Sequence, residues 1–265
     1  MTSHRNNSKK QNIYIPIKKF TNFFSVEIYQ PVLFITIILQ SKKNADISAM
    51  NIEDTFRHKG LRRKLIEELR GKGITSTEVL EAINRVPRHV FMDSGFIHFA
   101  YKDQAFPIGA GQTISQPYTV AFQTQLLEIK KLDKVLEVGT GSGYQCAVLL
   151  ELGAIVYTVE RQRELYLKSQ PLMSKLGYKP NFFFGDGYEG IAAYAPFDKI
   201  IITAGGSEIP QKLLNQLKIN GKLVMPVGGS ELQKMTLIEK ISDDEFRKTE
   251  HGSFQFVPLL KGRNY

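Results

Sequence analysis

Val135-Leu-Glu-Val-Gly-Thr-Gly-Ser-Gly-Tyr144 is the stretch that decides the fold, because an apolar run leads directly into three closely spaced glycines. The glycines stand at positions 139, 141 and 143. A dinucleotide-binding turn needs G-x-G-x-x-G, whose third glycine lets the helix pack on the strand and point its N-terminus at a pyrophosphate. Tyr144 occupies that third position here. The spacing therefore disfavours a dinucleotide cofactor and hydride transfer.

The compressed G-x-G-x-G spacing favours a different ligand. It suits a molecule without phosphates whose adenosyl and amino-acid parts lie across a backbone that lacks Cβ atoms. S-adenosylmethionine is such a ligand in Rossmann-like methyltransferases. The turn thus predicts an S-adenosylmethionine site made by Glu137, Gly139, Thr140, Gly141, Gly143 and Tyr144.

The residues after the turn predict an α/β fold with a Rossmann-like, doubly wound methyltransferase sheet. Residues 134–138 and 154–159 are apolar, β-rich runs, and residues 144–152 between them have helical character. Three further strands are expected at 181–184, 198–204 and 222–227. Alternating patches at 234–241 and 245–257 predict an added antiparallel strand pair.

Two acidic residues stand at strand ends of this sheet, where ligands of such folds bind. Glu160 ends the second strand, and a carboxylate there can accept hydrogen bonds from both ribose hydroxyls. Asp186 follows the third strand and can accept a hydrogen bond from the adenine amino group, while Gly187 lets the backbone approach the ring. The alternatives are a solvated charge that pairs with Arg161 or Arg163, and an ordinary Asp-Gly turn.

The predicted sheet divides the rest of the chain. Residues 50–265 are expected to form a single methyltransferase domain, with a helical lead-in at 50–130, the cofactor-binding sheet at 131–230 and C-terminal strands at 231–260. Apolar positions recur at helical spacing from Asp54 to Gly71, and a second helix is expected to end near Asn84. Residues 1–49 are expected to be an atypical or poorly ordered extension.

The location of the protein is open between two alternatives. The extension has a basic lead and an apolar run at 32–39, which is too short for a membrane span of about 20 residues. It partly resembles a secretory signal, but no small-residue cleavage site follows. A single cysteine, Cys146, fits a reducing compartment. We expect a cytoplasmic protein without stable membrane insertion, with export as the alternative.

The charge and the histidines argue against two other kinds of site. Of the net charge of +9, residues 1–50 carry +5, from seven Lys or Arg against two acids, and the other residues carry +4. The basic excess is largely a property of the tail, so no nucleic-acid binding is expected. The histidines at 4, 58, 89, 98 and 251 lack metal-ligand spacing, so no metal site is predicted.

Residues 106–118 are not periodic and are dense in Pro, Gly and hydrogen-bonding side chains, which predicts loops that carry specific chemistry. This segment belongs to a series of motifs: Arg85-Val-Pro-Arg-His89, Pro107-Ile-Gly-Ala-Gly-Gln-Thr-Ile-Ser-Gln-Pro117, the glycine turn with Glu160, Gly185-Asp-Gly187, Ala195-Pro-Phe-Asp-Lys-Ile-Ile-Ile-Thr-Ala204 and Phe256-Val-Pro-Leu259. In order and spacing they resemble the protein-L-isoaspartate O-methyltransferase family over about residues 54–262.

The resemblance implies an enzyme that methylates the α-carboxyl group of L-isoaspartyl residues in damaged proteins and peptides with S-adenosylmethionine. It implies a catalytic Ser115 and a substrate loop of Gln112, Thr113 and Ile114. Ser115, before Gln-Pro, also suits a helix N-cap, so both roles stay open. Arg88 and His89 are expected to pack the lead-in on the sheet. The chain departs from the family at Gly205-Gly206, which predicts a looser loop over the substrate.

Two other functions remain as alternatives, and a monomer is expected. A nucleic-acid methyltransferase would share the glycine turn, but a base-handling motif such as Asn-Pro-Pro-Tyr is expected where this chain has Thr203-Ala-Gly-Gly206. A non-catalytic cofactor-binding module would bind S-adenosylmethionine without turnover.

Overall fold

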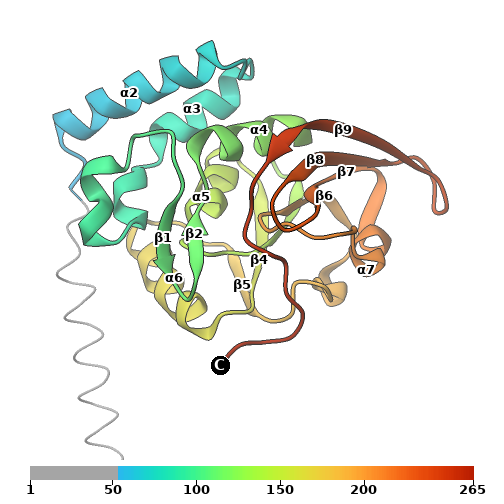
Figure 1. The fold of residues 1–265 in the computed structure, drawn as a ribbon. Helices are drawn as coiled ribbons and strands as arrows, with labels where there is room; N and C mark the ends of the chain where they lie inside the picture. Colours follow the sequence, from blue (N-terminus) through green and yellow to red (C-terminus); the bar gives the residue numbers. More distant parts are fainter. Residues whose placement is uncertain (1–52) are drawn as a thin grey trace, which may run out of the picture. The chain divides into compact units, whose positions relative to one another are not determined.

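A seven-stranded sheet with the order β5-β4-β3-β6-β7-β8-β9 lies at the centre of the molecule (Figure 1). The computed structural model describes residues 53–265. The strands from β5 to β7 are parallel, whereas β8 pairs antiparallel with both β7 and β9. The predicted α/β class with a C-terminal antiparallel strand pair is confirmed. The strands are β3 (Lys134–Val138), β4 (Ile155–Glu160), β5 (Asn181–Phe184), β6 (Phe197–Ile202), β7 (Leu217–Gly228), β8 (Gln233–Lys240) and β9 (Phe246–Phe254).

The direction in which the chain adds strands reverses at the centre of this sheet. β3, β4 and β5 follow one another outward on one side, and β6 and β7 continue on the other side of β3. Val138 and Ile202, near the carboxyl ends of β3 and β6, are partners in the sheet. Ligands of doubly wound sheets bind outside the carboxyl ends of the strands at such a reversal. The segments after Val138 and Ile202 are therefore placed where a site is expected.

Both faces of the sheet are covered, as β3 shows. Val135 packs into one core cluster and the next residue, Leu136, into a second, because side chains alternate across a strand. The first cluster includes side chains of five helices, whereas α7 (Gln211–Asn215) contributes to the second. The five helices are α2 (Phe56–Gly71), α3 (Thr77–Arg85), α4 (Pro117–Leu127), α5 (Tyr144–Glu151) and α6 (Arg163–Lys175).

The lead-in is helical, as predicted. α2 and α3 pack against each other, and Figure 1 shows them in blue and cyan at one end of the molecule. Short 3-10 helices, η1 (Arg88–Phe91) and η2 (Ser94–Phe99), connect them to the next segment, and a third, η3 (Ala192–Tyr194), lies before β6. None of the helices in residues 53–265 combines the length and the apolar character that crossing a membrane requires. The predicted extension of residues 1–49, and with it the question of an export signal, lies outside the described residues.

The segment predicted as a loop at 106–118 is partly a β-hairpin. β1 (Phe106–Gly109) pairs antiparallel with β2 (Gln112–Ile114). The two residues between them, Ala110 and Gly111, have φ angles of 49° and 67°. Two consecutive positive φ angles are typical of the tight hairpin turn whose twist matches the strands. Alanine rarely adopts this conformation, so the turn could not be predicted from Ala110-Gly111.

Candidate active site

A pocket opens at the carboxyl ends of β3 and β4. Its lining includes most of the predicted site residues, namely Gln112, Thr113, Ile114, Ser115, Gly139, Thr140, Gly141, Tyr144, Glu160 and Gly187. The structure thus brings the hairpin and the glycine turn, which are separated by α4 in the sequence, to one cavity. Glu137, Gly143 and Asp186 were also predicted to bind the cofactor, but they do not belong to the lining.

Two glycines keep the floor of this pocket free of side chains. Gly139 has a φ angle of 98°, and a Cβ there would lie 2.5 Å from Thr203 Oγ1. At Gly187 a Cβ would lie 2.5 Å from Val138 Cγ1. Any larger residue would therefore displace its neighbours at either position. Packing against Thr203 and Val138 thus requires glycine at both positions.

Glu160 holds the glycine turn through its carboxylate. One oxygen accepts a hydrogen bond from Gly141 N at 2.9 Å, and the other accepts one from Gln162 N at 2.8 Å. The residue is 4% exposed, and burial raises its pKa against the opposing effect of these backbone N–H groups. Each oxygen keeps a second lone pair. Glu160 can therefore support the turn and still accept two further hydrogen bonds from a ligand.

Glu137 lies behind the pocket rather than in its wall, which corrects its predicted direct role. It is fully buried, and burial raises its pKa to about 8. Thr158 donates a hydrogen bond of 2.6 Å to Glu137 Oε2, and Thr140 Oγ1 lies 2.6 Å from Thr158 Oγ1. Thr140 itself lines the pocket. Glu137 thus contacts the pocket through two threonines, as a support for the turn.

The carboxylate of Asp186 is used by the protein itself. Oδ1 accepts a hydrogen bond from Tyr188 N at 2.9 Å, and Oδ2 accepts one from Gly262 N at 2.6 Å. Gly262 belongs to the C-terminal segment, so Asp186 ties the chain end to the loop after β5. The same segment continues to Asn264, which bonds to Arg161 O and Arg163 N through its backbone. Asp186 therefore anchors the C-terminal segment while each of its oxygens keeps a second lone pair, and Gly143 is the N-cap of α5.

The sequence reasoning did not assign a site role to the C-terminal segment. Val257, Pro258, Leu259 and Leu260 line the pocket, as does Gln162. The Phe256-Val-Pro-Leu259 motif was visible in the sequence. Its position beside the pocket depends on how the chain folds, so the motif alone did not indicate a site role. Contacts from the C-terminus thus close the side of the pocket next to β4.

Gly205 and Gly206 do not loosen the loop after β6, contrary to the expectation. Gly205 N donates to Val257 O at 2.8 Å, and Leu259 N donates to Gly205 O at 2.7 Å. A Cβ at Gly206 would lie 2.7 Å from Met225 Cε. The small residues allow the C-terminal segment to pair closely with this loop, and the backbone bonds hold the loop in place.

Ser115 is not the helix cap that its sequence context suggested. Asp103 Oδ1 accepts the hydrogen bond from Tyr118 N at 2.7 Å in the first turn of α4, and the N-cap position is Gln116. Within residues 53–265 the hydroxyl of Ser115 has no hydrogen-bond partner. Ser115 lines the pocket and also a neighbouring groove of about 640 Å³. A free hydroxyl therefore stands at the junction of two cavities.

The neighbouring groove has aromatic walls. Tyr118 and Phe122 of α4 lie next to Phe254 at the end of β9, with ring centroids 6.3 Å and 5.3 Å from the Phe254 ring. Phe256 and Leu232 also line it. The groove shares Thr113, Ser115, Thr203 and Val257 with the cofactor pocket. It can hold an extended, partly apolar chain whose polar group reaches Ser115.

Arg88 and His89 pack the lead-in, as predicted, and are buried. The Arg88 guanidinium lies over the Tyr144 ring at 4.7 Å. His89 Nδ1 lies 2.8 Å from the Tyr101 hydroxyl, and burial together with the nearby His58 lowers the pKa of His89 to about 4. Neither residue lines the pocket. They join the lead-in helices to the helix that follows the glycine turn.

Comparisons with known proteins agree with this geometry. The family model described as protein-L-isoaspartate(D-aspartate) O-methyltransferase matches residues 60–264. The chain is 61% identical to a protein-L-isoaspartate O-methyltransferase of Christiangramia forsetii over 214 residues, which are 80% of this chain and 100% of the relative.

Solved structures are similar as well. A protein-L-isoaspartate O-methyltransferase aligns with a TM-score of 0.68 and 28% identity, over 74% of this chain and 65% of that one. A putative protein-L-isoaspartate O-methyltransferase from Plasmodium falciparum, crystallised with S-adenosyl-L-homocysteine, aligns with a TM-score of 0.67 and 25% identity, over 76% of this chain and 99% of that one. By its motifs, its fold and these matches, the chain belongs to the protein-L-isoaspartate(D-aspartate) O-methyltransferase family.

Proposed function

We propose that this protein transfers the methyl group of S-adenosylmethionine to the α-carboxyl group of L-isoaspartyl residues in damaged proteins and peptides. The observation that carries the proposal is the position of Ser115, whose free hydroxyl lies in the wall shared by the cofactor pocket and the aromatic groove. Family membership supports the choice of acceptor. The methyl ester then collapses to a succinimide, and its hydrolysis partly restores normal aspartate.

The pocket fits S-adenosylmethionine. Glu160 keeps two lone pairs for the ribose hydroxyls, and the missing Cβ atoms of Gly139 and Gly187 leave room for a flat ligand on the backbone. Gln145 also lines the pocket, and its Oε1 has no hydrogen-bond partner in the described structure. An amino group would satisfy this acceptor. The residues therefore match both the adenosine and the amino-acid parts of the cofactor.

The chemistry needs alignment rather than a base. S-adenosylmethionine supplies a methyl group on a positively charged sulfur. A carboxylate oxygen is already an anion at neutral pH, so it can form the C–O bond while the C–S electron pair stays on sulfur, and no proton moves. Holding the two reactants in line lowers the barrier by up to about 7–11 kcal/mol.

Two features place the acceptor carboxylate. The Ser115 hydroxyl donates a hydrogen bond to it, and the N-terminus of α4, which begins at Pro117, favours negative charge beside it. The aromatic groove receives the peptide on either side of the isoaspartyl residue. We further propose that the protein acts as a cytoplasmic monomer on exposed, flexible sites and does not act on nucleic acid. The concentration of +5 of the net charge of +9 in residues 1–50 supports the last point.

The test uses labelled S-adenosylmethionine and paired peptides that differ only in isoaspartate versus aspartate. We expect base-labile label on the isoaspartyl peptide alone, because only it yields the predicted ester. Label on RNA instead would indicate a nucleic-acid methyltransferase. Cofactor binding without any transfer would indicate a non-catalytic module, and either result would refute the proposal.

A variant tests the role of the hydroxyl. Ser115→Ala should lower kcat by about 10- to 150-fold, since a hydrogen bond to a charged group contributes about 1.5–3 kcal/mol. The affinity for S-adenosylhomocysteine, measured by calorimetry, should stay within twofold. Ser207→Ala, in the loop after β6, is the matched control. Full activity of Ser115→Ala would leave the serine without a catalytic role.

A further inference from the structure

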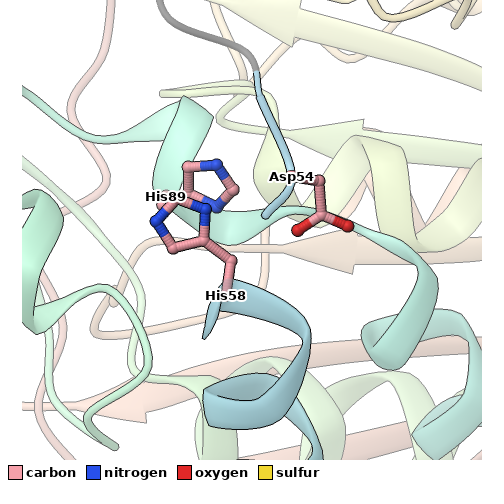
Figure 2. Close-up of side chains that lie close together, drawn as sticks. All are labelled: Asp54, His58 and His89. Atoms are coloured by element: carbon pink, nitrogen blue, oxygen red, sulfur yellow. The ribbon is translucent and has the colours of Figure 1, made fainter. Parts of the chain in front are cut away.

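Three potential metal ligands meet where the lead-in begins. Asp54 precedes α2, His58 lies in its first turn, and His89 belongs to η1 (Figure 2). One ligand atom from each lies within 4.8 Å of the other two. Figure 2 shows the two imidazole rings lying over each other, and their centroids are 3.8 Å apart. The spacing of the histidines in the sequence predicted no metal site. Spacing alone does not show that the start of α2 lies beside η1 in the folded chain.

A backbone oxygen lies between the two imidazoles. Glu53 O is 3.1 Å from His58 Nδ1 and 3.2 Å from His89 Nε2. These are hydrogen-bond distances. They also match the distance between two ligand atoms of a tetrahedral zinc site, which is about 3.3 Å when the metal–ligand distances are about 2.0–2.1 Å. Each ring nitrogen therefore lies at a ligand-to-ligand distance from the Glu53 oxygen that suits one shared metal ion.

Hydrogen bonds from surrounding residues orient two of the potential ligands, His89 and Asp54, as they do in known metal sites. His89 uses its other nitrogen toward the Tyr101 hydroxyl at 2.8 Å. Arg62 donates to both oxygens of Asp54, at 3.0 Å and 2.9 Å. Each of these oxygens keeps a second lone pair for a metal ion. Such outer contacts fix the orientation of ligating imidazoles and carboxylates.

The ligand set selects the kind of ion. Two imidazoles with one carboxylate and one carbonyl suit Zn²⁺ and similar transition metals, whereas Mg²⁺ and Ca²⁺ prefer oxygen ligands alone. The positive charge of Arg62 beside Asp54 weakens any cation site. The two nitrogen ligands therefore have to supply most of the affinity.

We propose that Asp54, His58, His89 and the carbonyl of Glu53 bind a zinc-type divalent ion that fastens the start of the lead-in to η1. The ion replaces the two hydrogen bonds to the Glu53 oxygen. The widest separation between ligand atoms, up to 4.8 Å, has to shorten by about 1.5 Å to reach the ligand-to-ligand distance of a tetrahedral site. Asp54 and His58 are only half-buried and can supply this movement, whereas His89 is buried.

Calorimetric titration of the untagged, chelator-treated full chain with Zn²⁺ tests the site. His4 lies outside the described residues and is replaced by Ala in every sample, so that it adds no ligand. We expect one ion per chain, a rise in Tm with Zn²⁺ and none with Mg²⁺. Co²⁺ at the same site should give the strong visible absorption of tetrahedral coordination.

Variants assign the ligands. His58→Ala should weaken Zn²⁺ binding at least about 100-fold, and Tyr101→Phe about tenfold, because outer contacts matter less than ligands. His98→Ala, at an exposed histidine of η2, is the matched control and should bind as the parent does. Unchanged S-adenosylhomocysteine affinity shows that each variant is folded. Failure of the parent to bind one Zn²⁺, or equal affinity in His58→Ala, would show that the cluster is only a hydrogen-bonded packing element.

Discussion

The cofactor pocket and the metal-ligand cluster are assembled in different ways. The pocket is built on strand ends: the residues after β3, β4 and β6 reach one edge because the register of the sheet brings Val138 and Ile202 together. The cluster depends on the contact between α2 and η1, where the His58 and His89 rings lie 3.8 Å apart and both reach the Glu53 backbone oxygen. A site on a regular sheet can be predicted from a local motif, whereas a site made by packing cannot.

The same difference determines what a substitution should change. In the pocket, backbone groups such as Gly141 N hold the shape, and side chains such as Glu160 line the cavity. Changing them should affect ligand affinity more than stability. Residues behind the pocket or in the lead-in contact only the protein, so changing them should affect stability. The following experiments test this distinction.

The largest effect is expected for Glu160→Gln. An amide cannot accept from two ribose hydroxyls and two backbone N–H groups, since one of its ends is a donor. Hydrogen bonds to a charged group are worth about 1.5–3 kcal/mol each, so S-adenosylhomocysteine affinity should fall by about 3 kcal/mol, or roughly 150-fold. Calorimetry measures the change. Glu164→Gln, at an exposed glutamate of α6, is the control. Unchanged affinity would remove Glu160 from the cofactor site.

Glu137 should make stability depend on pH. Its pKa is about 8 in the folded protein and 4.5 in its ordinary state, so between these values the folded chain holds a proton that the unfolded chain has lost. The free energy of unfolding therefore falls as pH rises from about 5 to 8, by at most about 1.4 kcal/mol per unit. Stability from this group is complete below pH 4.5 and is lost above 8.

Glu137→Gln tests this dependence by denaturant unfolding at pH 5, 6, 7 and 8. The glutamine does not titrate, so the decline should be smaller in the variant, and the two curves should approach or cross toward pH 8. Parallel curves would mean that Glu137 does not bind its proton in the folded state. Cofactor affinity should change little, since Glu137 reaches the pocket only through Thr158 and Thr140.

The sequence predicted the sheet, its antiparallel pair and the glycine turn, because alternating and apolar runs determine strands locally. It also predicted Glu137 and Asp186 as cofactor ligands, because both are acids near strand ends, but neither belongs to the pocket lining. The alternation of side chains along β3 points Glu137 into the interior. Gly262, which is distant in the sequence, donates a backbone hydrogen bond to the Asp186 carboxylate. It also gave Ser115 a possible capping role, because the cap comes from Asp103, outside the local sequence.

Asp103 links the first turn of α4 to the C-terminal end of α2, and its substitution should show the smallest effect. Its carboxylate accepts hydrogen bonds from Tyr118 N at 2.7 Å, Gln116 Nε2 at 2.9 Å and Lys72 Nζ at 2.6 Å. Asp103→Asn keeps one oxygen acceptor but loses the charge at the start of α4. The free energy of unfolding should fall by about 1–2 kcal/mol, as for a lost helix cap, with a minor part from the half-exposed Lys72.

Ser115→Ala is the matched comparison for this variant. Because its hydroxyl has no partner in residues 53–265, its loss should change the free energy of unfolding by less than about 0.5 kcal/mol while turnover falls. Asp103→Asn should show the opposite pattern, with stability reduced and turnover less affected. Denaturant unfolding and methyl-transfer rates on the same samples measure both. Equal destabilisation by the two substitutions would mean that Ser115 stabilises the first turn of α4. The substrate loop would then contain residues that support the fold as well as residues that bind the substrate.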